Sequence, residues 1–234
     1  PIKPGTDGAL ILALIHEIIK QGLYDREFLI QYTNAAQMVN LDKDSDDFGL
    51  LVRTEEEDTA HLAQPQDQVW WDRHANKPVM THTPGVDPKL LGEYTLEDGT
   101  PVKTAFQMLV DRVKDYTPEW AADITGIPAE TISRLAHEMG ITARDEKIEL
   151  PIAWTDTWGN DHEAVVGNPV SFHAMRGLAA HSNGFQTIRA LSILMSILGT
   201  IDRPGGFRHK APFPRPIPPC PKTPNGPQGV KPNS

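Results

Sequence analysis

Cysteine is almost absent from this sequence. Only one occurs among the 234 residues, Cys220, and it lies between two prolines. Disulfide frameworks and cysteine-rich iron–sulfur or zinc sites each need several cysteines, so they are excluded within this chain. Cys220 itself is interpreted as incidental rather than as a ligand.

Long apolar runs and an excess of basic charge are missing as well. The longest apolar stretch covers residues 9–15, well below the ~18 residues that a membrane span needs. Lys and Arg number 22 against 31 Asp and Glu, which gives a formal net charge of -9. Because phosphate binding needs a basic face, no nucleic-acid partner is expected. Hydrophobic residues at 39% and charged residues at 23% suit a globular protein.

Several motifs that carry chemistry are also lacking. The sequence holds no GxxxxGK phosphate loop, no GxGxxG fingerprint and no Ser-His-Asp order. The histidines show no i, i+4 pair typical of a helical metal site, and the acidic run Asp42–Asp47 lacks the glycine and distal Glu of a calcium loop. No catalytic residue and no metal ligand is predicted. The histidines in question are His61, His74, His82, His162, His173 and His181.

The start of the chain predicts a turn that leads into a buried helix. Pro4 and Gly5 favour the turn, and Thr6 or Asp7 is expected to cap the helix. Residues 9–20 are apolar almost all round, which indicates burial on most sides. Gly22 fits the end of this helix, and a short second helix is expected over residues 25–32.

The character of the sequence changes between residues 40 and 104. Two acidic runs, Asp42–Asp47 and Glu55–Asp58, are followed by the turn dipeptides Pro84-Gly85 and Asp98-Gly99. The pattern indicates an insertion of loops and short β segments. We expect it to pack outside the core, with both acidic runs exposed to solvent.

Helical patterns return after this region. Thr117 followed by Pro118 predicts a helix start, and Gly140 is expected to end the next helix. Residues 147–154 are predicted to form a buried strand. In the last helix Ile188, Leu191, Met195 and Leu198 share an apolar face. The expected helices cover residues 104–114, 117 onward, 128–140 and 186–198, the last of which ends at the turn 202–206.

The whole pattern predicts an α/β fold that is rich in helix. We expect this sequence to contain only some of the layers of that fold. Four regions are expected: residues 1–40 as the start of an α/β domain, 41–104 as the acidic insertion, 105–210 as the remainder of that domain and 211–234 as a proline-rich linker. Pro1 in first place and a proline-rich end lead us to expect an internal piece of a longer protein.

Two short polar segments are candidate binding sites. Gly5, Thr6 and Asp7 precede a helix, where free amides and the helix dipole attract anions. The Asp7 carboxylate could also accept two parallel hydrogen bonds from a guanine edge. A plain capped turn is the alternative, and the spacing alone favours it.

The second candidate is the segment His181, Ser182, Asn183 and Gly184, between two expected helices. Such a segment can press backbone and short side chains against a ligand. Its alternative is an ordinary interhelix turn, in which Asn-Gly supplies a positive φ. Again the segment alone favours the turn.

Three stretches together resemble the dimethyl sulfoxide reductase family of molybdopterin oxidoreductases. They are PGTDGALILALIHEIIKQGLYDREFL, YTPEWAADITGIPAETISRLA and MRGLAAHSNGFQTIRALSILMSILGTIDRPGGF, in the family's order. The segment THTPGVDPKLLGEYTLEDGTPVKTAFQ and the tail FRHKAPFPRPIPP are similar to the sulfur-metabolising branch: sulfite dehydrogenase, thiosulfate reductase and polysulfide reductase. PVSFHAMRGLAAHSNGFQT is most similar to the sulfite dehydrogenase type.

The resemblance implies a Rossmann-like layered fold and a cofactor, a bis-molybdopterin guanine dinucleotide with molybdenum. Gly5, Thr6 and Asp7 would hold a guanosine end, and the segment 181–184 the pterin side. A 4Fe-4S cluster is implied in an N-terminal part that this sequence lacks. Many relatives carry Gln where this chain has Ala180, so that contact is not carried over.

The implied partners are the remainder of the catalytic subunit, an iron–sulfur subunit for electron transfer, and a membrane anchor that exchanges electrons with quinone. The enzyme would lie at a membrane through these partners, on the cytoplasmic or the periplasmic face, with the cytoplasmic face favoured. Two alternatives stay open. One is a redox scaffold without molybdenum, related to the large iron–sulfur subunit of NADH dehydrogenase. The other is an interaction module whose proline-rich tail binds an SH3-like groove.

Overall fold

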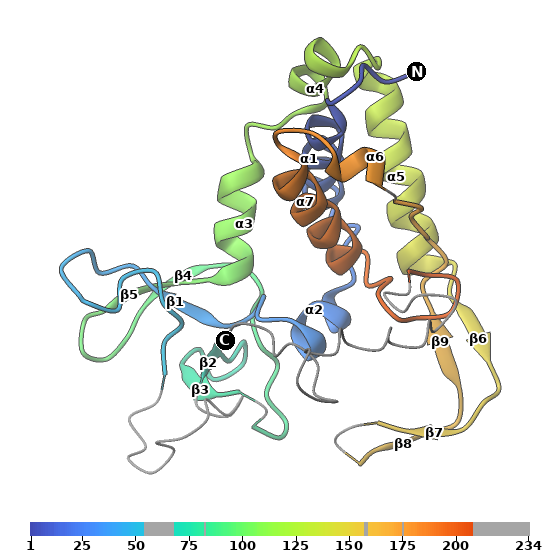
Figure 1. Cartoon of the computed structure of the whole chain (residues 1–234). Helices are drawn as coiled ribbons and strands as arrows, with labels where there is room; N and C mark the ends of the chain where they lie inside the picture. Colours follow the sequence, from blue (N-terminus) through green and yellow to red (C-terminus); the bar gives the residue numbers. More distant parts are fainter. Residues whose placement is uncertain (54–67, 82, 157–158, 175, 208–234) are drawn as a thin grey trace, which may run out of the picture.

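Helix α1 (Asp7–Lys20) lies at the centre of the molecule. The computed structural model describes residues 1–53, 68–81, 83–156, 159–174 and 176–207. Ala13, Ile15 and Ile18 of α1 are fully buried, as the apolar pattern predicts. Four helices pack around α1 (Figure 1): α3 (Ala105–Val113), α4 (Pro118–Thr125), α5 (Ala129–Asp145) and α7 (Gly184–Ile197).

Side-chain caps fix the starts of three helices. The Asp25 carboxylate accepts from the Phe28 N–H at the start of α2 (Arg26–Tyr32). Thr104 and Thr117 cap α3 and α4 in the same way, each satisfying one N–H that the helix leaves free. The predicted start at Thr117 and the helix over residues 25–32 are confirmed.

The prediction that Gly140 ends its helix is wrong. Helix α5 continues through Gly140 to Asp145. A Cβ built on Gly140 would lie 2.6 Å from Cβ of Leu23. The glycine therefore allows close approach of the segment after α1, and it does not terminate the helix.

Within the described residues the strands form four small antiparallel sheets. The three-stranded one has the order β1-β5-β4, with Met38 opposite Thr104. Mixed helix and strand content confirms the α/β prediction in its coarse form. The described residues contain no parallel sheet covered by helices, so the Rossmann-like layering is not confirmed. The strands are β1 (Met38–Asn40), β2 (Val69–Trp71), β3 (Pro78–Met80), β4 (Glu93–Thr95), β5 (Pro101–Thr104), β6 (Ile148–Leu150), β7 (Trp154–Thr155), β8 (Asp161–His162) and β9 (Val165–Gly167).

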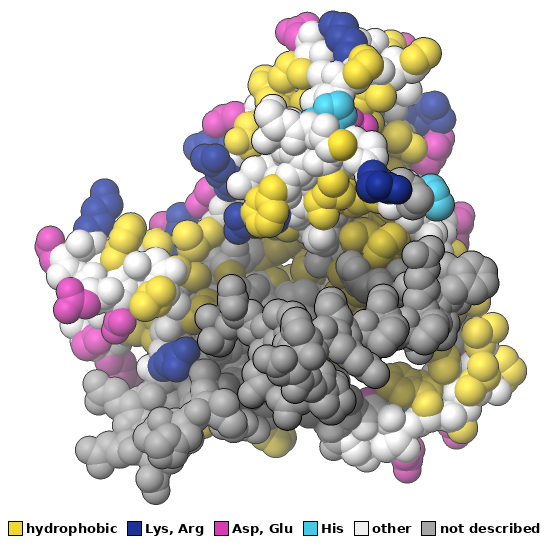
Figure 2. Space-filling view, viewed as in Figure 1, with side chains coloured by type: hydrophobic (Ala, Val, Ile, Leu, Met, Phe, Trp, Pro, Cys, Tyr) yellow, Lys and Arg dark blue, Asp and Glu magenta, His cyan; other side chains and the backbone are white. Residues whose placement is uncertain are grey.

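The prediction of one buried strand over residues 147–154 is also wrong. The chain forms two short strands there, β6 and β7, with Pro151 between them. Both belong to an arm that projects from the helices (Figure 1) and leaves hydrophobic side chains at the surface (Figure 2). Leu150, Ile152 and Trp154 are exposed. Proline has no N–H for a ladder, which interrupts the strand that the apolar residues suggest.

The acidic residues are exposed as expected where the structure describes them, but the expectation that the region packs outside the core is wrong: Trp70 and Leu90 belong to the same core cluster as the buried residues of α1. Asp44, Asp46 and Asp47 are exposed and Asp42 is half-buried. Glu55–Asp58 and the linker 211–234 lie outside the described residues. Strand β1 lies before the expected boundary at residue 40, and it pairs with β5, which lies after that boundary. The division of the chain into four regions stays a prediction. In the part of the chain that is described, no helix combines the length and hydrophobicity needed to cross a membrane.

Candidate functional site

The turn before α1 has the shape expected of it but a different hydrogen bond. Gly5 has φ +77°, a left-handed conformation that glycine adopts without strain. Thr6 occupies the N-cap position, yet its side chain makes no cap bond. The Thr6 hydroxyl instead donates to the Lys3 carbonyl over 2.7 Å. The expected side-chain cap at Thr6 or Asp7 is therefore wrong.

The segment before α7 connects that helix to the short helix α6 (Arg176–Ala179). The Gly184 N–H donates to the His181 carbonyl over 2.9 Å. Asn183 has φ -98°, so the expected positive φ is absent, although the segment does form a turn between two helices, as the alternative predicts. Gly184 is required for a different reason: a Cβ there would lie 2.0 Å from the Ala179 carbonyl oxygen.

The structure brings the two predicted segments together. An ideal Cβ on Gly5 would lie 3.4 Å from Nδ1 of His181. One turn further, a Cβ on Gly8 would lie 3.0 Å from Oγ1 of Thr187 and 4.0 Å from Nδ2 of Asn183. Helices α1 and α7 thus begin side by side, and their first turns approach closely because glycine occupies α1 at these positions.

Neither of the two adjoining helix starts has a side-chain cap. The side chain at each N-cap, Thr6 for α1 and Asn183 for α7, makes no cap hydrogen bond. Helix α5 also begins without one, whereas α2, α3 and α4 all have one. The first N–H groups of both helices carry a partial positive charge. The pair therefore presents a surface suited to anionic or hydrogen-bond-accepting groups.

The polar side chains of this surface are accessible. His181, Ser182 and Asn183 are exposed, and Asp7 is half-buried. Within the described residues the Asp7 carboxylate has neither a hydrogen bond nor an ion pair. It is therefore free to accept hydrogen bonds from a ligand.

A cavity of about 980 Å³ adjoins the two helix starts, between α1, α3, α4 and α7. Asn183 of the predicted segments lines it, and so do Gly8, Thr187 and two exposed cations, Arg112 and Arg189. Neither arginine has an ion pair within the described part of the chain. Sequence reasoning missed these four residues. Their only signal in the sequence is a position on a helix face next to a predicted segment.

The histidines in the described residues make local contacts. His162 pairs with Asp156 at 3.1 Å and stacks on Trp154 at 4.5 Å between ring centroids. His74 lies 3.8 Å from Asp87. His61 and His82 lie outside the described residues. Among residues that are described, no three His, Cys, Asp or Glu side chains are grouped as metal ligands would be.

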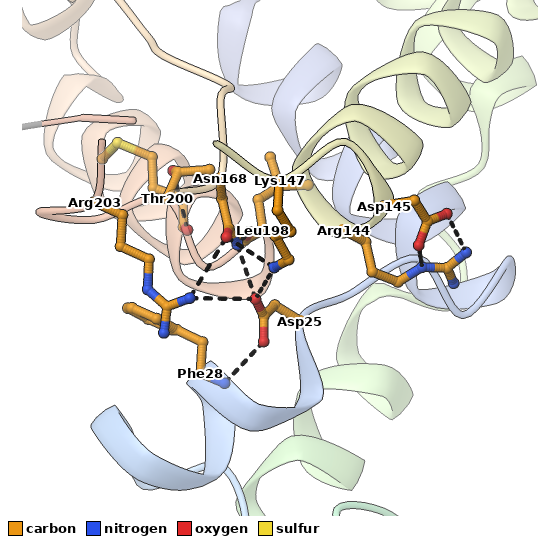
Figure 3. A network of polar contacts seen from close by, with 10 residues as sticks. Asp25, Phe28, Arg144, Asp145, Lys147, Asn168, Leu198, Thr200 and Arg203 are labelled. Atoms are coloured by element: carbon orange, nitrogen blue, oxygen red, sulfur yellow. Dashed lines mark hydrogen bonds and ion pairs between the residues drawn. The ribbon is translucent and has the colours of Figure 1, made fainter. Parts of the chain in front are cut away.

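A second polar centre surrounds Asp25, at the opposite end of α7 (Figure 3). Its Oδ2 accepts from Lys147 at 2.9 Å and from the amide of the fully buried Asn168 at 2.8 Å. Burial raises the pKa of Asp25, but bonds from Lys147, Phe28 and Asn168 outweigh this, so the pKa lies below its usual value.

The same Asn168 amide donates to the Leu198 carbonyl at 2.8 Å, and the Asp25 N–H donates to Ile197 at 2.8 Å. The Arg203 guanidinium lies over the Phe28 ring, 5.1 Å from its centroid. These contacts join α2, α7 and the arm that carries β6 and β9. Because the carboxylate is occupied by protein donors, we interpret this centre as structural.

Comparison with known proteins adds the family context. The chain is 66% identical over its whole length to a sulfite dehydrogenase subunit of Allochromatium vinosum. Over 58% of the chain it is 32% identical to a perchlorate reductase subunit of Dechloromonas aromatica. It is also 33% identical, over 58% of its length, to the putative dimethyl sulfoxide reductase catalytic subunit of Halobacterium salinarum. No family model matches the sequence.

These relatives are oxidoreductase subunits of the dimethyl sulfoxide reductase type. The resemblance found in the sequence is confirmed at that level, and so is the prediction that the chain is related to an enzyme. The chain spans 24%, 18% and 15% of the lengths of the three relatives. It therefore corresponds to no more than about a quarter of each.

Proposed function

We propose that this chain forms the part of a molybdopterin oxidoreductase catalytic subunit that holds a guanine dinucleotide of the cofactor. The observation that carries the proposal is the meeting of two uncapped helix starts, with Gly5 against His181. The residues that resemble the family's cofactor-contacting segments lie far apart in the sequence and adjoin in space.

The residues present fit such a cofactor. Left-handed Gly5 and the absence of a side chain at Gly8 leave the first turns of α1 and α7 close together. The free carboxylate of Asp7 matches the paired N–H groups of a guanine edge. The adjoining cavity offers Arg112 and Arg189, whose guanidinium groups match phosphate oxygens.

The roles of these side chains follow from that arrangement. Asp7 would orient the guanine, while Gly5 and Thr6 bring backbone against it. His181, Ser182, Asn183 and Gly184 would contact the pterin side. When bound, the cofactor supplies the redox chemistry at its molybdenum, and this chain contributes orientation and electrostatics. No residue here is proposed as an acid, a base or a metal ligand.

The substrate of the intact enzyme is proposed from its 66% identical relative, whose name gives sulfite. We propose oxo-transfer chemistry on an inorganic sulfur compound, with sulfite ahead of thiosulfate and polysulfide. A 4Fe-4S cluster elsewhere in the subunit, an iron–sulfur partner and a quinone-linked membrane anchor would carry the electrons. The enzyme would then be attached to the membrane through these partners, with the cytoplasmic face favoured.

The test of the proposal is Asp7→Asn in the intact enzyme. Asn places a donor where the carboxylate had an acceptor, so one charge-assisted bond is lost and a donor faces a donor. We expect a cost of roughly 2–4 kcal/mol, or about 30- to 1000-fold in affinity for the dinucleotide. Pterin dinucleotide content should fall sharply while the thermal stability of the apo form stays nearly unchanged.

Asp123→Asn is the matched control, because Asp123 is an exposed carboxylate on another helix, α4. It should leave the cofactor content unchanged. Full cofactor occupancy in Asp7→Asn would contradict the proposed role. An equal loss in both variants would show that the effect is one of charge and not of position.

A further inference from the structure

A second site, independent of the proposed function, lies beside α2. A small cavity of about 300 Å³ is lined by three basic side chains and three others, which we call the basic pocket: Tyr24, Arg26, Arg73, Lys89, Leu90 and Leu91. Its volume is at the small end of the range for ligand pockets. It shares no residue with the cavity beside the helix starts.

The two arginines are held in place by one carboxylate. Asp87 pairs with the Arg26 guanidinium through Oδ1 and with Nε of Arg73 through Oδ2, the latter at 3.2 Å. Nη2 of Arg26 also donates to the Pro88 carbonyl at 2.6 Å. The backbone N–H of Arg73 donates to the Asp87 carbonyl at 2.9 Å. Two segments far apart in the sequence are thereby joined, and their cations are fixed.

The turn that carries Arg73 is itself braced. The Asp72 carboxylate accepts from the N–H groups of His74 and Ala75, each at 3.1 Å. These bonds, that from His74 first, lower the pKa of Asp72 below its usual value. Asp72 therefore stays charged at neutral pH and holds the turn. A braced turn loses less conformational entropy when a ligand binds, which favours affinity.

The charges of the basic pocket do not balance. Arg26, Arg73 and Lys89 bring three positive charges to the lining of the pocket. Asp87 compensates one of them, and the charged carboxylate of Asp72, one residue before Arg73, reduces the surplus further. Lys89 donates only to the neutral side chain of Asn76, at 3.2 Å, among the described residues. The lining of the basic pocket therefore carries a positive surplus in a chain whose formal net charge is -9.

One donor at this site also lacks an acceptor. Nε of Arg26 is buried and has no hydrogen-bond partner among the described residues. A buried donor left without a partner is unfavourable. Because this Nε is buried, an ion in the pocket would meet the accessible donors of Arg73 and Lys89, and the positive surplus is what favours an anionic acceptor.

We propose that the basic pocket binds a doubly charged tetrahedral oxyanion of the sulfate or phosphate type. The negative charge of such an ion complements the basic lining of the pocket. Its oxygens accept charge-assisted hydrogen bonds from guanidinium and ammonium groups. The neighbouring Leu90 is buried, which gives the pocket an apolar side and reduces screening of the charges by solvent.

Titration calorimetry of the intact protein that contains this chain, with sodium sulfate as the titrant and sodium chloride of equal ionic strength as the reference, tests this proposal. We expect saturable binding of sulfate. Arg73→Gln and Lys89→Gln should each weaken it about tenfold, the loss of one charge-assisted bond at ~1.4 kcal/mol. Lys89→Gln is the safer variant for folding, since its ammonium group contacts only Asn76 and the Tyr94 ring within the described part of the chain.

Arg134→Gln is the matched control, because Arg134 is an exposed cation on α5 paired with Glu138. It removes the same charge away from the pocket and should leave the affinity unchanged. Acetate, with a single charge, should bind at least about tenfold more weakly than sulfate. The proposal is overturned if sulfate does not saturate, if acetate binds equally well, or if the control variant loses as much affinity as the two pocket variants.

Discussion

Removal of the Asp25 carboxylate should destabilise the chain more than any other single change in its polar interior. Asp25→Ala removes the cap of α2, a loss of about 1 kcal/mol. It also leaves the amide of Asn168, which is fully buried, with one acceptor fewer, at about 1–3 kcal/mol. Lys147 is 31% exposed and can turn to water. The sum predicts a loss of about 2–4 kcal/mol.

Asp25→Asn separates the contribution of the helix cap from that of the bonds with Lys147 and Asn168. Asn caps a helix about as well as Asp, so the bond to the Phe28 N–H is kept. With its oxygen on the Phe28 N–H, the Asn side chain has an NH2 group in place of Oδ2, which accepts from neither Lys147 nor Asn168. We therefore expect a smaller loss, about 1–3 kcal/mol. Asp123→Ala, at an exposed carboxylate with no such partners in the described residues, should change stability by less than about 0.5 kcal/mol.

The pH dependence follows from the lowered pKa of Asp25. An unfolded Asp titrates near pH ~3.9, and the native carboxyl titrates below that value. The unfolded state therefore takes up the proton first as the pH falls. The contribution of Asp25 is complete at pH 7, and it is lost as the pH drops from about 4 through the lower native pKa.

Urea unfolding of the wild type and of both variants, from pH 7 to about pH 3, measures these differences. The gap between wild type and Asp25→Asn should narrow at the acid end. Equal stability of Asp25→Ala and wild type at pH 7 would refute the reasoning. So would a gap between wild type and Asp25→Asn that stays constant down to pH 3.

Two further predictions concern glycine and capping. Gly140→Ala should destabilise the chain by about 1–3 kcal/mol, because the new Cβ meets Leu23 at 2.6 Å. Gly177→Ala in α6, where a Cβ would have nothing within 4 Å, should be neutral or stabilising. Equal effects of the two substitutions in thermal melts would contradict the packing argument. Thr117→Ala should lower the free energy of unfolding by about 0.5–2 kcal/mol through loss of the α4 cap. Thr6→Ala, which removes no cap bond from α1, should lower it by less in urea unfolding. A reversed order would show that the cap assignments are wrong.

Local signals in the sequence predicted the helices well. Apolar residues over 9–20 and the pair Thr117-Pro118 specify burial and a cap through neighbours along the chain, and the structure has α1 and α4 there. The predictions for Gly140 and for residues 147–154 were wrong for other reasons. Leu23, distant in the sequence, decides the role of Gly140, and Pro151 divides the expected strand.

The candidate site was predictable in its residues but not in its assembly. Gly5 to Asp7 and His181 to Gly184 each favoured an ordinary turn when considered alone. Their contact through Gly5 and His181 depends on the packing of α1 against α7, which no local pattern specifies. Arg112 and Arg189 were missed for the same reason: an exposed arginine on a helix gives no sign of the cavity it lines.

The basic pocket shows the same limit. Arg26, Arg73 and Lys89 are separated widely in the sequence and lie in a chain with an excess of acidic residues. Only the pairing of the first two with Asp87 brings them together. The net charge of the whole chain does not indicate where a local surplus of positive charge lies.

The central claim is that the adjoining starts of α1 and α7 hold a guanine dinucleotide. An experimental structure of the intact enzyme with its cofactor tests it most directly. The account predicts the guanine N–H groups within about 2.7–3.2 Å of the Asp7 carboxylate oxygens, with the segment 181–184 against the pterin side of the cofactor. A dinucleotide bound elsewhere, with Asp7 facing solvent or protein, would contradict it.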